Sequence, residues 1–376
     1  MPPRPASQVR LTITEKIQLV FTIAIVLAQT CISALRAPFL SPEKRSRVSQ
    51  RHVAYQLVHN LFSHTSSKVE QALSPDTDVI YRQWAKKTGV TPEKETIKDG
   101  SDAFWIGSKD AKTILLYFHG GGYNIPALPG HLDFLWNLVK DLNASADGGF
   151  AVLLLQYDVS PFEVYPRQLA QAAGLVNHVL ETLKVAPENI LIGGDSAGGN
   201  MTLGVISHIL HPHPDPSVPR IEQAFGKGRK LKGAFLIAPW TDPFSSEYDS
   251  MKRNYGKDLL SATFLLRWSS SFLNGQPQDP YNKPIATPAG WWDNVSEVLE
   301  GFFLACGLDD LLLDSALQFA TTFKQAWKDE KDTTVALAEN EGHISCIMDP
   351  SFGFKSDDVQ MYVQARDWLR KTLPPV

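Results

Sequence analysis

Ser196 lies in the run Gly194-Asp195-Ser196-Ala197-Gly198, between a strand-like stretch at 190–193 and a helical stretch at 200–210. On a sharp strand-to-helix turn, strained backbone holds a serine exposed, and the helix N-terminus directs N–H groups toward negative charge. Gly194 and Gly198 are expected because side chains there would collide with the neighbouring strand and helix. The five-residue pattern can arise by chance, but the strand before it and the helix after it favour a nucleophilic serine at position 196.

A second glycine-rich run follows an earlier strand-like stretch. Residues Thr113–Phe118 lead into His119-Gly120-Gly121-Gly122. Three glycines leave the backbone free to turn N–H groups toward a ligand oxygen, as the binding of a tetrahedral oxyanion requires. A flexible turn would explain the glycines, but not their place directly after a core strand. We expect Gly121, Gly122 and Ala197 to supply the N–H donors, and His119 to position this loop rather than act as a base.

A nucleophilic serine needs a base and an acid that orients the base, and in the matching chain order the acid comes before the histidine. His343 stands just past the strand-like run Thr333–Ala338 and is the expected base, whereas His208, His211 and His213 belong to a helix end and a proline-rich loop. The acid is expected in the cluster Asp309, Asp310 and Asp314, which follows another such run. Active-site loops lie at this carboxyl end of the strands in open α/β sheets.

Short apolar runs and helical patterns alternate over most of the chain, which predicts a mostly parallel sheet covered by helices on both faces. The predicted strands are Ala103–Ile106, Thr113–His119, Phe150–Tyr157, Ile190–Gly193, Gly233–Ala238, Gly301–Cys306 and Thr333–Ala338. The main domain is expected at 101–376, with a cap insertion at about 241–294 that lacks strand runs and is rich in aromatic residues. A helical cap region at 41–100 and a hydrophobic segment at 1–40 precede it.

Composition excludes several other classes of function. The chain has 376 residues and a net charge of −4, so its charge balance provides no excess of positive charge to bind the phosphate backbone of a nucleic acid. Its three cysteines cannot form a disulfide framework; one bridge, Cys306 to Cys346, is the most they allow, and buried free thiols are favoured. The histidines in the proline-rich loop 211–219 are expected to be solvent-exposed, and no metal site is expected.

Residues 17–35 contain no charged residue, and as a helix they would extend about 28 Å, close to the thickness of a bilayer's hydrocarbon core. A cleaved signal peptide fits poorly because 16 residues precede the apolar run and no good cleavage site follows it. A helix of a soluble cap is the second alternative, because polar residues such as Gln18 and Gln29 dilute the hydrophobicity. A membrane-anchoring or membrane-lying helix is favoured, with the endoplasmic reticulum as the candidate membrane and its sidedness open.

The chain resembles the hormone-sensitive-lipase-like branch of the α/β-hydrolases, because both HGGG and GDSAGG are intact and in the correct order. The resemblance covers about residues 103–373 and includes stretches at 157–168 and 238–242 that are similar to further family motifs. In the family pattern the acid stands four residues before a second aspartate, which selects Asp310. The local sequence departs from that pattern, so Asp309 stays an alternative. The N-terminus and cap look like those of fungal steryl-acetyl-hydrolase-like and secondary-metabolite hydrolases.

The resemblance implies a serine hydrolase of carboxylic esters, with Ser196, His343 and Asp310 as its triad, Gly121, Gly122 and Ala197 as its oxyanion hole, and no cofactor. The expected substrate is a small hydrophobic ester. Two alternatives stay open: the same triad can serve acyl transfer or cyclisation, and some relatives only bind ligands after losing the histidine. The oligomeric state is left undetermined.

Overall fold

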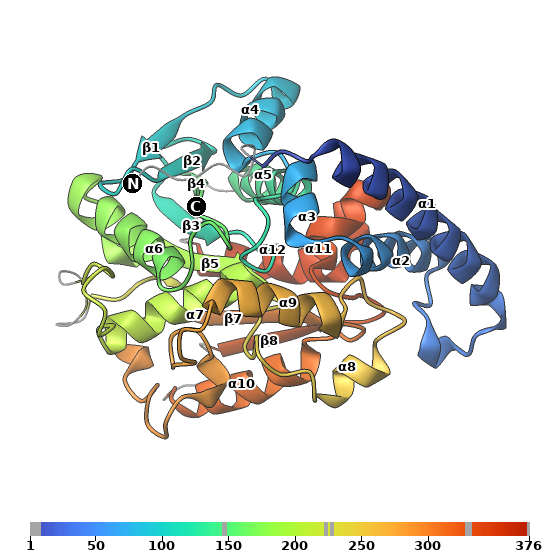
Figure 1. Ribbon diagram of the computed structural model, residues 1–376. Helices are drawn as coiled ribbons and strands as arrows, with labels where there is room; N and C mark the ends of the chain where they lie inside the picture. Colours follow the sequence, from blue (N-terminus) through green and yellow to red (C-terminus); the bar gives the residue numbers. More distant parts are fainter. Residues whose placement is uncertain (1–8, 145–148, 222–224, 226–228, 328–332, 374–376) are drawn as a thin grey trace.

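A mostly parallel β-sheet crosses the middle of the molecule in the computed structural model, which describes residues 9–144, 149–221, 225, 229–327 and 333–373 (Figure 1). The strand order is β1-β2-β4-β3-β5-β6-β7-β8, with β1 and β2 antiparallel to their neighbours and the other pairs parallel. The strands are β1 Lys94–Thr96, β2 Asp102–Ile106, β3 Thr113–Phe118, β4 Phe150–Leu155, β5 Ile190–Asp195, β6 Gly233–Ile237, β7 Phe302–Gly307 and β8 Thr333–Ala338. The parallel sheet expected from the alternating pattern is therefore confirmed.

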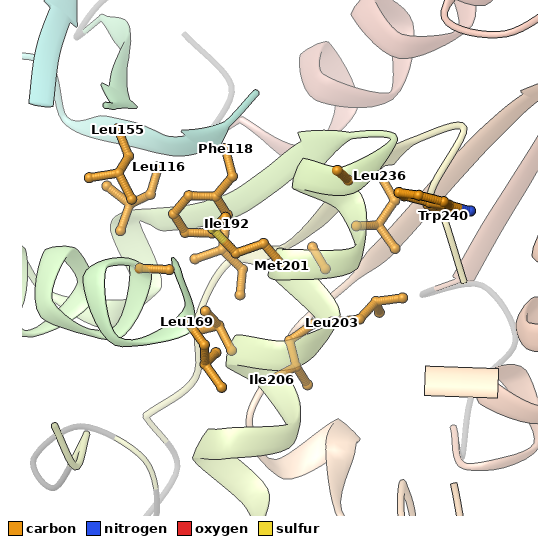
Figure 2. Close-up of a cluster of buried hydrophobic side chains, with 14 of the residues drawn as sticks. Leu116, Phe118, Leu155, Leu169, Ile192, Met201, Leu203, Ile206, Leu236 and Trp240 are labelled. Carbon is orange, nitrogen blue, oxygen red and sulfur yellow. The ribbon is translucent and has the colours of Figure 1, made fainter. Parts of the chain in front are cut away.

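Helices cover both faces of this sheet because the central strands are apolar on both sides. Leu116, Phe118 and Ile192 point toward the face covered by α6 (Arg167–Asn177), α7 (Ala197–Leu210) and α10 (Leu313–Gln325), as Figure 2 shows for α6 and α7. Leu115 and Tyr117, one position along in β3, face the core made with α5 (Pro129–Asn143) and α12 (Gln360–Thr372). Successive side chains of a strand alternate between its faces, so each central strand contributes to both cores.

Segment 41–100, which was expected to be a helical cap region, holds three helices and one strand. The helices are α2 Ser49–His64, α3 Ser67–Leu73 and α4 Thr77–Thr88. Strand β1 has a charged sequence and lies at the edge of the sheet, so no apolar run marks it. The insertion 241–294 lies between β6 and β7 and carries α8 (Asp249–Arg253) and α9 (Ala262–Leu273).

The uncharged N-terminal stretch forms α1 (Ile13–Arg36), which runs along α2 at the edge of the molecule (Figure 1). Among the described residues, α1 is the one helix that is both long enough and apolar enough to cross a membrane. A signal sequence or a helix of a soluble core can pass the same test. Two of the polar residues of α1 contact α2: Thr30 Oγ1 accepts from Asn60 Nδ2 at 3.2 Å, and Gln29 contacts His64 at 3.3 Å. Large apolar side chains, including Phe21 at 66% exposure, face outward.

Two smaller expectations need correction. His213 is not solvent-exposed, because its side chain packs beside Tyr165 and shares a 2.8 Å hydrogen bond with the Tyr165 hydroxyl. Cys306 and Cys346 are buried free thiols, as expected, but Cys31 is exposed because it lies on α1, whose side chains are mostly outside the core.

Candidate active site

The turn between β5 and α7 places Ser196 at the carboxyl end of the central strand. Ser196 has φ +52° and ψ −116°, a conformation that L residues rarely adopt, and its backbone N–H donates to the carbonyl oxygen of Ile237 at 2.9 Å. A Cβ at Gly194 or Gly198 would lie 2.3 or 1.8 Å from the carbonyl oxygen of Phe118. The expected need for glycine on both sides of the serine therefore has a direct cause, the close approach of β3.

The His119–Gly122 loop lies against this turn. The N–H of Gly120 donates to Asp195 Oδ1 at 3.0 Å, and a Cβ on Gly120 would lie 2.2 Å from Asp195 Oδ2. Gly121 and Gly122 have φ +100° and +60° and line one cavity together with Ser196. Among the described residues, no group accepts a hydrogen bond from the N–H of Gly121, Gly122 or Ala197. These three donors are therefore free for a ligand oxygen.

His119 is buried under this loop. Its ring stacks on Tyr157 at 4.2 Å between centroids, and its Nδ1–H donates to the Gly120 carbonyl oxygen at 2.7 Å. Burial, together with the nearby His131, lowers the pKa of His119 to about 3, so the ring is neutral. A neutral ring tied to the loop backbone suits the positioning role expected for it.

Asp195 is held by a partner that the motifs did not indicate, His131 of α5. Its carboxylate accepts from Tyr117 Oη at 2.9 Å and from His131 Nε2 at 3.1 Å. Because Nδ1 of His131 accepts the Leu128 N–H at 2.9 Å, Nε2 carries the hydrogen donated to Asp195. Burial would raise the pKa of Asp195, but His131 and these hydrogen bonds lower it. The residue before the serine thus anchors the turn to α5, β3 and the glycine loop.

The loops after β7 and β8 bring an acid to the histidine. Asp310 Oδ2 lies 3.0 Å from His343 Nδ1, and both side chains are buried. Asp309 points elsewhere and pairs with Lys257 at 3.1 Å. Burial would lower the pKa of His343, but the charge and hydrogen bond of Asp310 outweigh it and raise that pKa. An imidazole oriented and made more basic in this way can accept a proton at Nε2.

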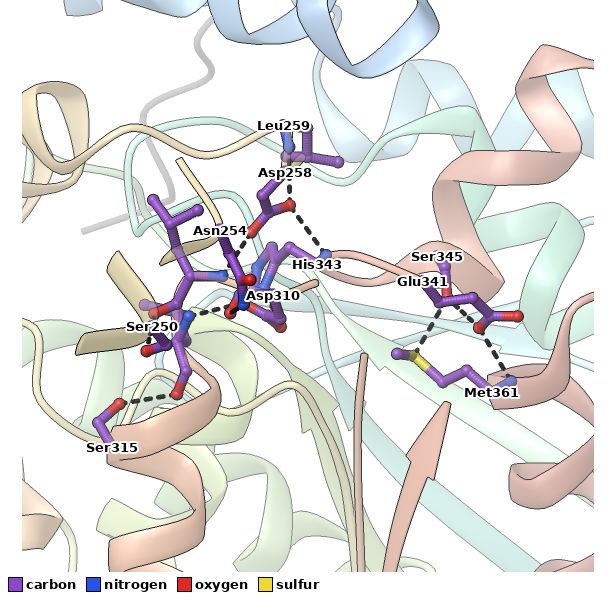
Figure 3. A network of polar contacts seen from close by, with 12 residues as sticks. Ser250, Asn254, Asp258, Leu259, Asp310, Ser315, Glu341, His343, Ser345 and Met361 are labelled. Carbon is purple, nitrogen blue, oxygen red and sulfur yellow. Dashed lines mark hydrogen bonds and ion pairs between the residues drawn. The ribbon is translucent and has the colours of Figure 1, made fainter. Parts of the chain in front are cut away.

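A further buried carboxylate, Asp258, lies beside this pair and carried no signal in the sequence. Figure 3 shows it between the loop of Asp310 and the loop of His343. It accepts backbone hydrogen bonds from His343 at 2.9 Å and from Leu311 at 2.7 Å. It belongs to the insertion between β6 and β7, in the chain between α8 and α9.

Ser196 and His343 line the same cavity, which has a volume of about 40 Å³. No hydrogen bond joins their side chains in the described structure; such contacts are often long before a substrate is bound. The other walls are mostly apolar and come from α2, α9 and the loops beside the serine: Val58, Phe62, Ile125, Leu128, Leu259, Leu260, Phe264, Trp268, Ile344 and Met348. A larger cavity of about 390 Å³ lies near Arg167 and His178, away from these groups.

The N-terminal helices hold two parts of the site in place. From α3, buried Glu70 accepts from Trp268 Nε1 and Asn124 Nδ2, each at 2.8 Å, and pairs with Arg267. A Cβ on Gly122 would meet the Trp268 ring at 2.2 Å, so this network also supports the glycine loop.

From α2, Arg51 binds the segment that carries His343. Arg51 Nε and Nη2 donate to Asp349 Oδ2 at 2.8 and 2.5 Å, and Nη1 donates to the Asn340 carbonyl oxygen at 2.7 Å. Tyr55 Oη donates to Asp349 Oδ1 at 2.8 Å. Asn340 and Asp349 flank His343, so α2 holds this loop on both sides of the histidine.

Comparison with known proteins gives one family. A family described as alpha/beta hydrolase fold matches residues 115–346. Steryl acetyl hydrolase 1 of Saccharomyces cerevisiae is 31% identical over 104 residues, which are 27% of this chain and 23% of that protein. Arylacetamide deacetylase of Oryctolagus cuniculus is 28% identical over 196 residues, 49% of this chain and 45% of its own. The chain therefore spans less than half the length of these relatives.

Solved structures show the same fold. A mutant of the esterase E40 has a TM-score of 0.64 at 20% identity and covers 87% of this chain and 100% of its own. An esterase from the bacterial hormone-sensitive lipase family has a TM-score of 0.60 at 19% identity and covers 94% and 98%.

Proposed function

The chain belongs to the family of the alpha/beta hydrolase fold, and we propose that it is a serine hydrolase of carboxylic esters. The motifs and the relatives support the hormone-sensitive-lipase-like branch. The observation that carries the proposal is the convergence of three parts on one cavity: Ser196 on its strained turn, the free N–H groups of Gly121 and Gly122, and His343 with Asp310 behind it.

In the proposed reaction Ser196 Oγ attacks the ester carbonyl carbon while His343 Nε2 takes the serine proton. Asp310 keeps the imidazole in the tautomer with its hydrogen on Nδ1 and stabilises the imidazolium. The N–H groups of Gly121, Gly122 and Ala197 bind the oxyanion. His343 then gives its proton to the leaving alcohol, and a water molecule hydrolyses the acyl-enzyme by the same steps. In such sites the loss of one oxyanion donor typically costs about 10²–10³ in rate.

The small apolar cavity favours a short acyl group. A volume of about 40 Å³ holds only a few atoms of a ligand, and Trp268, fixed by Glu70, limits its extension over Gly122. Three relatives are named for acetyl esters or acetamides: steryl acetyl hydrolase 1, arylacetamide deacetylase and an ethyl acetate hydrolase of Pseudomonas putida. We therefore propose acetyl-type esters of a hydrophobic alcohol as the substrate class.

The test of the function is ester hydrolysis and labelling by a fluorophosphonate probe. Ser196→Ala should abolish both while the protein stays folded, and Ser217→Ala, an exposed serine in the proline-rich loop, should change neither. Analysis of products distinguishes hydrolysis from acyl transfer or cyclisation, because only hydrolysis releases the free acid. Folded wild-type protein that neither reacts with the probe nor cleaves any ester would refute the proposal in favour of ligand binding.

The acyl preference has its own test. With a series of p-nitrophenyl esters, kcat/KM should fall from acetate to octanoate. Trp268→Phe should raise the octanoate-to-acetate ratio because a smaller ring leaves more room above Gly122. A wild-type enzyme that prefers octanoate would contradict the inferred substrate class but not the chemistry.

We also propose that α1 binds a membrane by lying in its surface. While α1 is docked along α2, it cannot cross a bilayer without drawing in the polar residues of α2, among them Asn60 and His64. Its outward side chains include Phe21 and Leu35, at 66% and 74% exposure, and such a face can insert into the acyl boundary of a bilayer.

Fractionation and vesicle flotation test this placement. The full chain should float with vesicles, whereas a chain that starts at residue 40 should not float but should still cleave p-nitrophenyl acetate. Phe21→Ser with Leu35→Ser should weaken flotation, and Leu73→Ser, an exposed apolar residue of α3, should not. A soluble full chain together with an aggregated shortened chain would instead make α1 part of the soluble cap.

A further inference from the structure

Asp258 is fully buried, and its carboxylate accepts three hydrogen bonds, all from backbone N–H groups. Oδ1 accepts from Leu259 at 2.7 Å and from His343 at 2.9 Å, and Oδ2 accepts from Leu311 at 2.7 Å. A carboxylate that accepts hydrogen bonds from several backbone N–H groups can fix the positions of the loops that donate them. Its partners come from three separate segments of the chain.

Two of these partners belong to the loops of the candidate triad. Leu311 directly follows Asp310 at the end of β7, and the other N–H is that of His343 itself, after β8. A backbone bond of 2.9 Å from Asp309 to the Glu341 carbonyl oxygen also joins the loops, but two residues before these contacts. Asp258 therefore joins the loops where the acid and the base are mounted (Figure 3).

We propose that Asp258 is a positioning residue that sets the geometry of the Asp310–His343 pair by binding the loops that carry them. This inference rests on the proposed esterase function. Asp258 comes from the insertion between β6 and β7, so the same segment that supplies α9 to the cavity also aligns the base. Small misplacements of a catalytic group, about 1 Å, can cost about 100-fold in rate.

The charges around Asp258 give this role a measurable signature. The titratable groups that face it are Asp310 and His343 on the two loops and Tyr55 on α2, with Arg51 and Asp349 behind Tyr55. Burial and the charge of Asp310 raise the pKa of Asp258 to about 7, against the effect of His343 and the backbone N–H groups. In turn, the charge of Asp258 helps to raise the pKa of His343. An uncharged residue at 258 should therefore lower the pKa of His343.

The experiment compares Asp258→Asn with Asp309→Asn, which removes a carboxylate from the neighbouring loop that pairs with Lys257 instead. For Asp258→Asn we expect kcat on p-nitrophenyl acetate to fall about 100-fold with a much smaller change in KM, because the base is misplaced whereas, among the apolar cavity walls, only Leu259 is bonded to residue 258. We also expect the acid limb of its kcat/KM profile to move to lower pH, since a general base acts only when deprotonated. Asp309→Asn should leave that limb in place.

Asp258→Glu separates charge from geometry. It retains the anion but moves it, so kcat should be reduced while the acid limb stays near its wild-type pH. Wild-type kcat in Asp258→Asn, or a lowered kcat with an unmoved limb, would overturn the proposal. If Asp258→Asn does not fold, Asp258→Glu decides, and failure of both to fold would assign Asp258 to fold stability and overturn it too. If the wild-type protein itself shows neither esterase activity nor probe labelling, the proposed function is refuted instead.

Discussion

Replacing Arg51 by methionine should destabilise the protein and impair the proposed base, because Arg51 neutralises a fully buried carboxylate beside the His343 loop. Met fills much of the same space but leaves Asp349 with Tyr55 as its remaining side-chain partner and the Asn340 carbonyl without its donor. Removing one partner of a buried ion pair typically costs about 3–5 kcal/mol. For a chain of this length, that loss lowers the thermal midpoint by about 5 °C.

The sign of the pH dependence follows from Asp349. Burial already raises its pKa, and Arg51 opposes that rise. Without Arg51 the pKa of Asp349 in the folded state should rise further above its unfolded value. Stability is then retained at low pH, where the carboxyl is protonated in both states, and is lost as pH rises through the folded-state pKa. The difference between wild type and Arg51→Met should therefore be larger at pH 8 than at pH 5.

The assay is a set of thermal melts across this pH range, together with kcat on p-nitrophenyl acetate. Adding Asp349→Asn to Arg51→Met should recover part of the lost stability, because no unpaired charge stays buried. Arg82→Met is the matched control: Arg82 pairs with Asp78 on the surface, at 63% exposure, and such pairs contribute at most about 1 kcal/mol. An Arg51→Met protein with wild-type melting and kcat at pH 8 would show that α2 does not hold the His343 loop.

Two further predictions concern the acid and the base. Asp310→Asn should lower kcat by about 10⁴, as loss of the orienting acid does in the best-known serine triad, whereas Asp309→Asn should cost far less; the opposite ranking would mean that Asp309 is the acid. In the wild type, kcat/KM should fall as pH drops through the raised pKa of His343, so the midpoint of the acid limb should lie above 6.5; a midpoint below 6.5 would contradict the influence of Asp310.

Features that depend on residues close together in the sequence could be predicted from the sequence alone. Central strands such as β3 and β5 are continuous apolar runs, and the glycines around Ser196 mark a turn that β3 approaches closely. Edge strand β1 could not be predicted in this way, because a three-residue charged strand is stabilised by pairing with β2 and not by an apolar pattern of its own.

The choice between adjacent residues needed the tertiary structure. Asp309 and Asp310 occupy the same loop and are chemically identical, so the resemblance to family spacing favoured Asp310 without excluding its neighbour. In the folded chain Asp310 contacts His343 and Asp309 contacts Lys257. Consecutive side chains in a loop point in different directions, and which one meets the histidine depends on the packing of two strand ends.

The residues that support the site were invisible in the sequence for a related reason. Arg51 and Asp349 are 298 positions apart, and Asp258 reaches His343 across 85 positions, so no local pattern signals either contact. Likewise, the sequence by itself determined that residues 17–35 form an uncharged helix, but only the fold places the polar Gln29 and Thr30 of that helix against α2. A periodic pattern records which side chains share a face, whereas the partner of that face is decided by which distant segments the chain brings together.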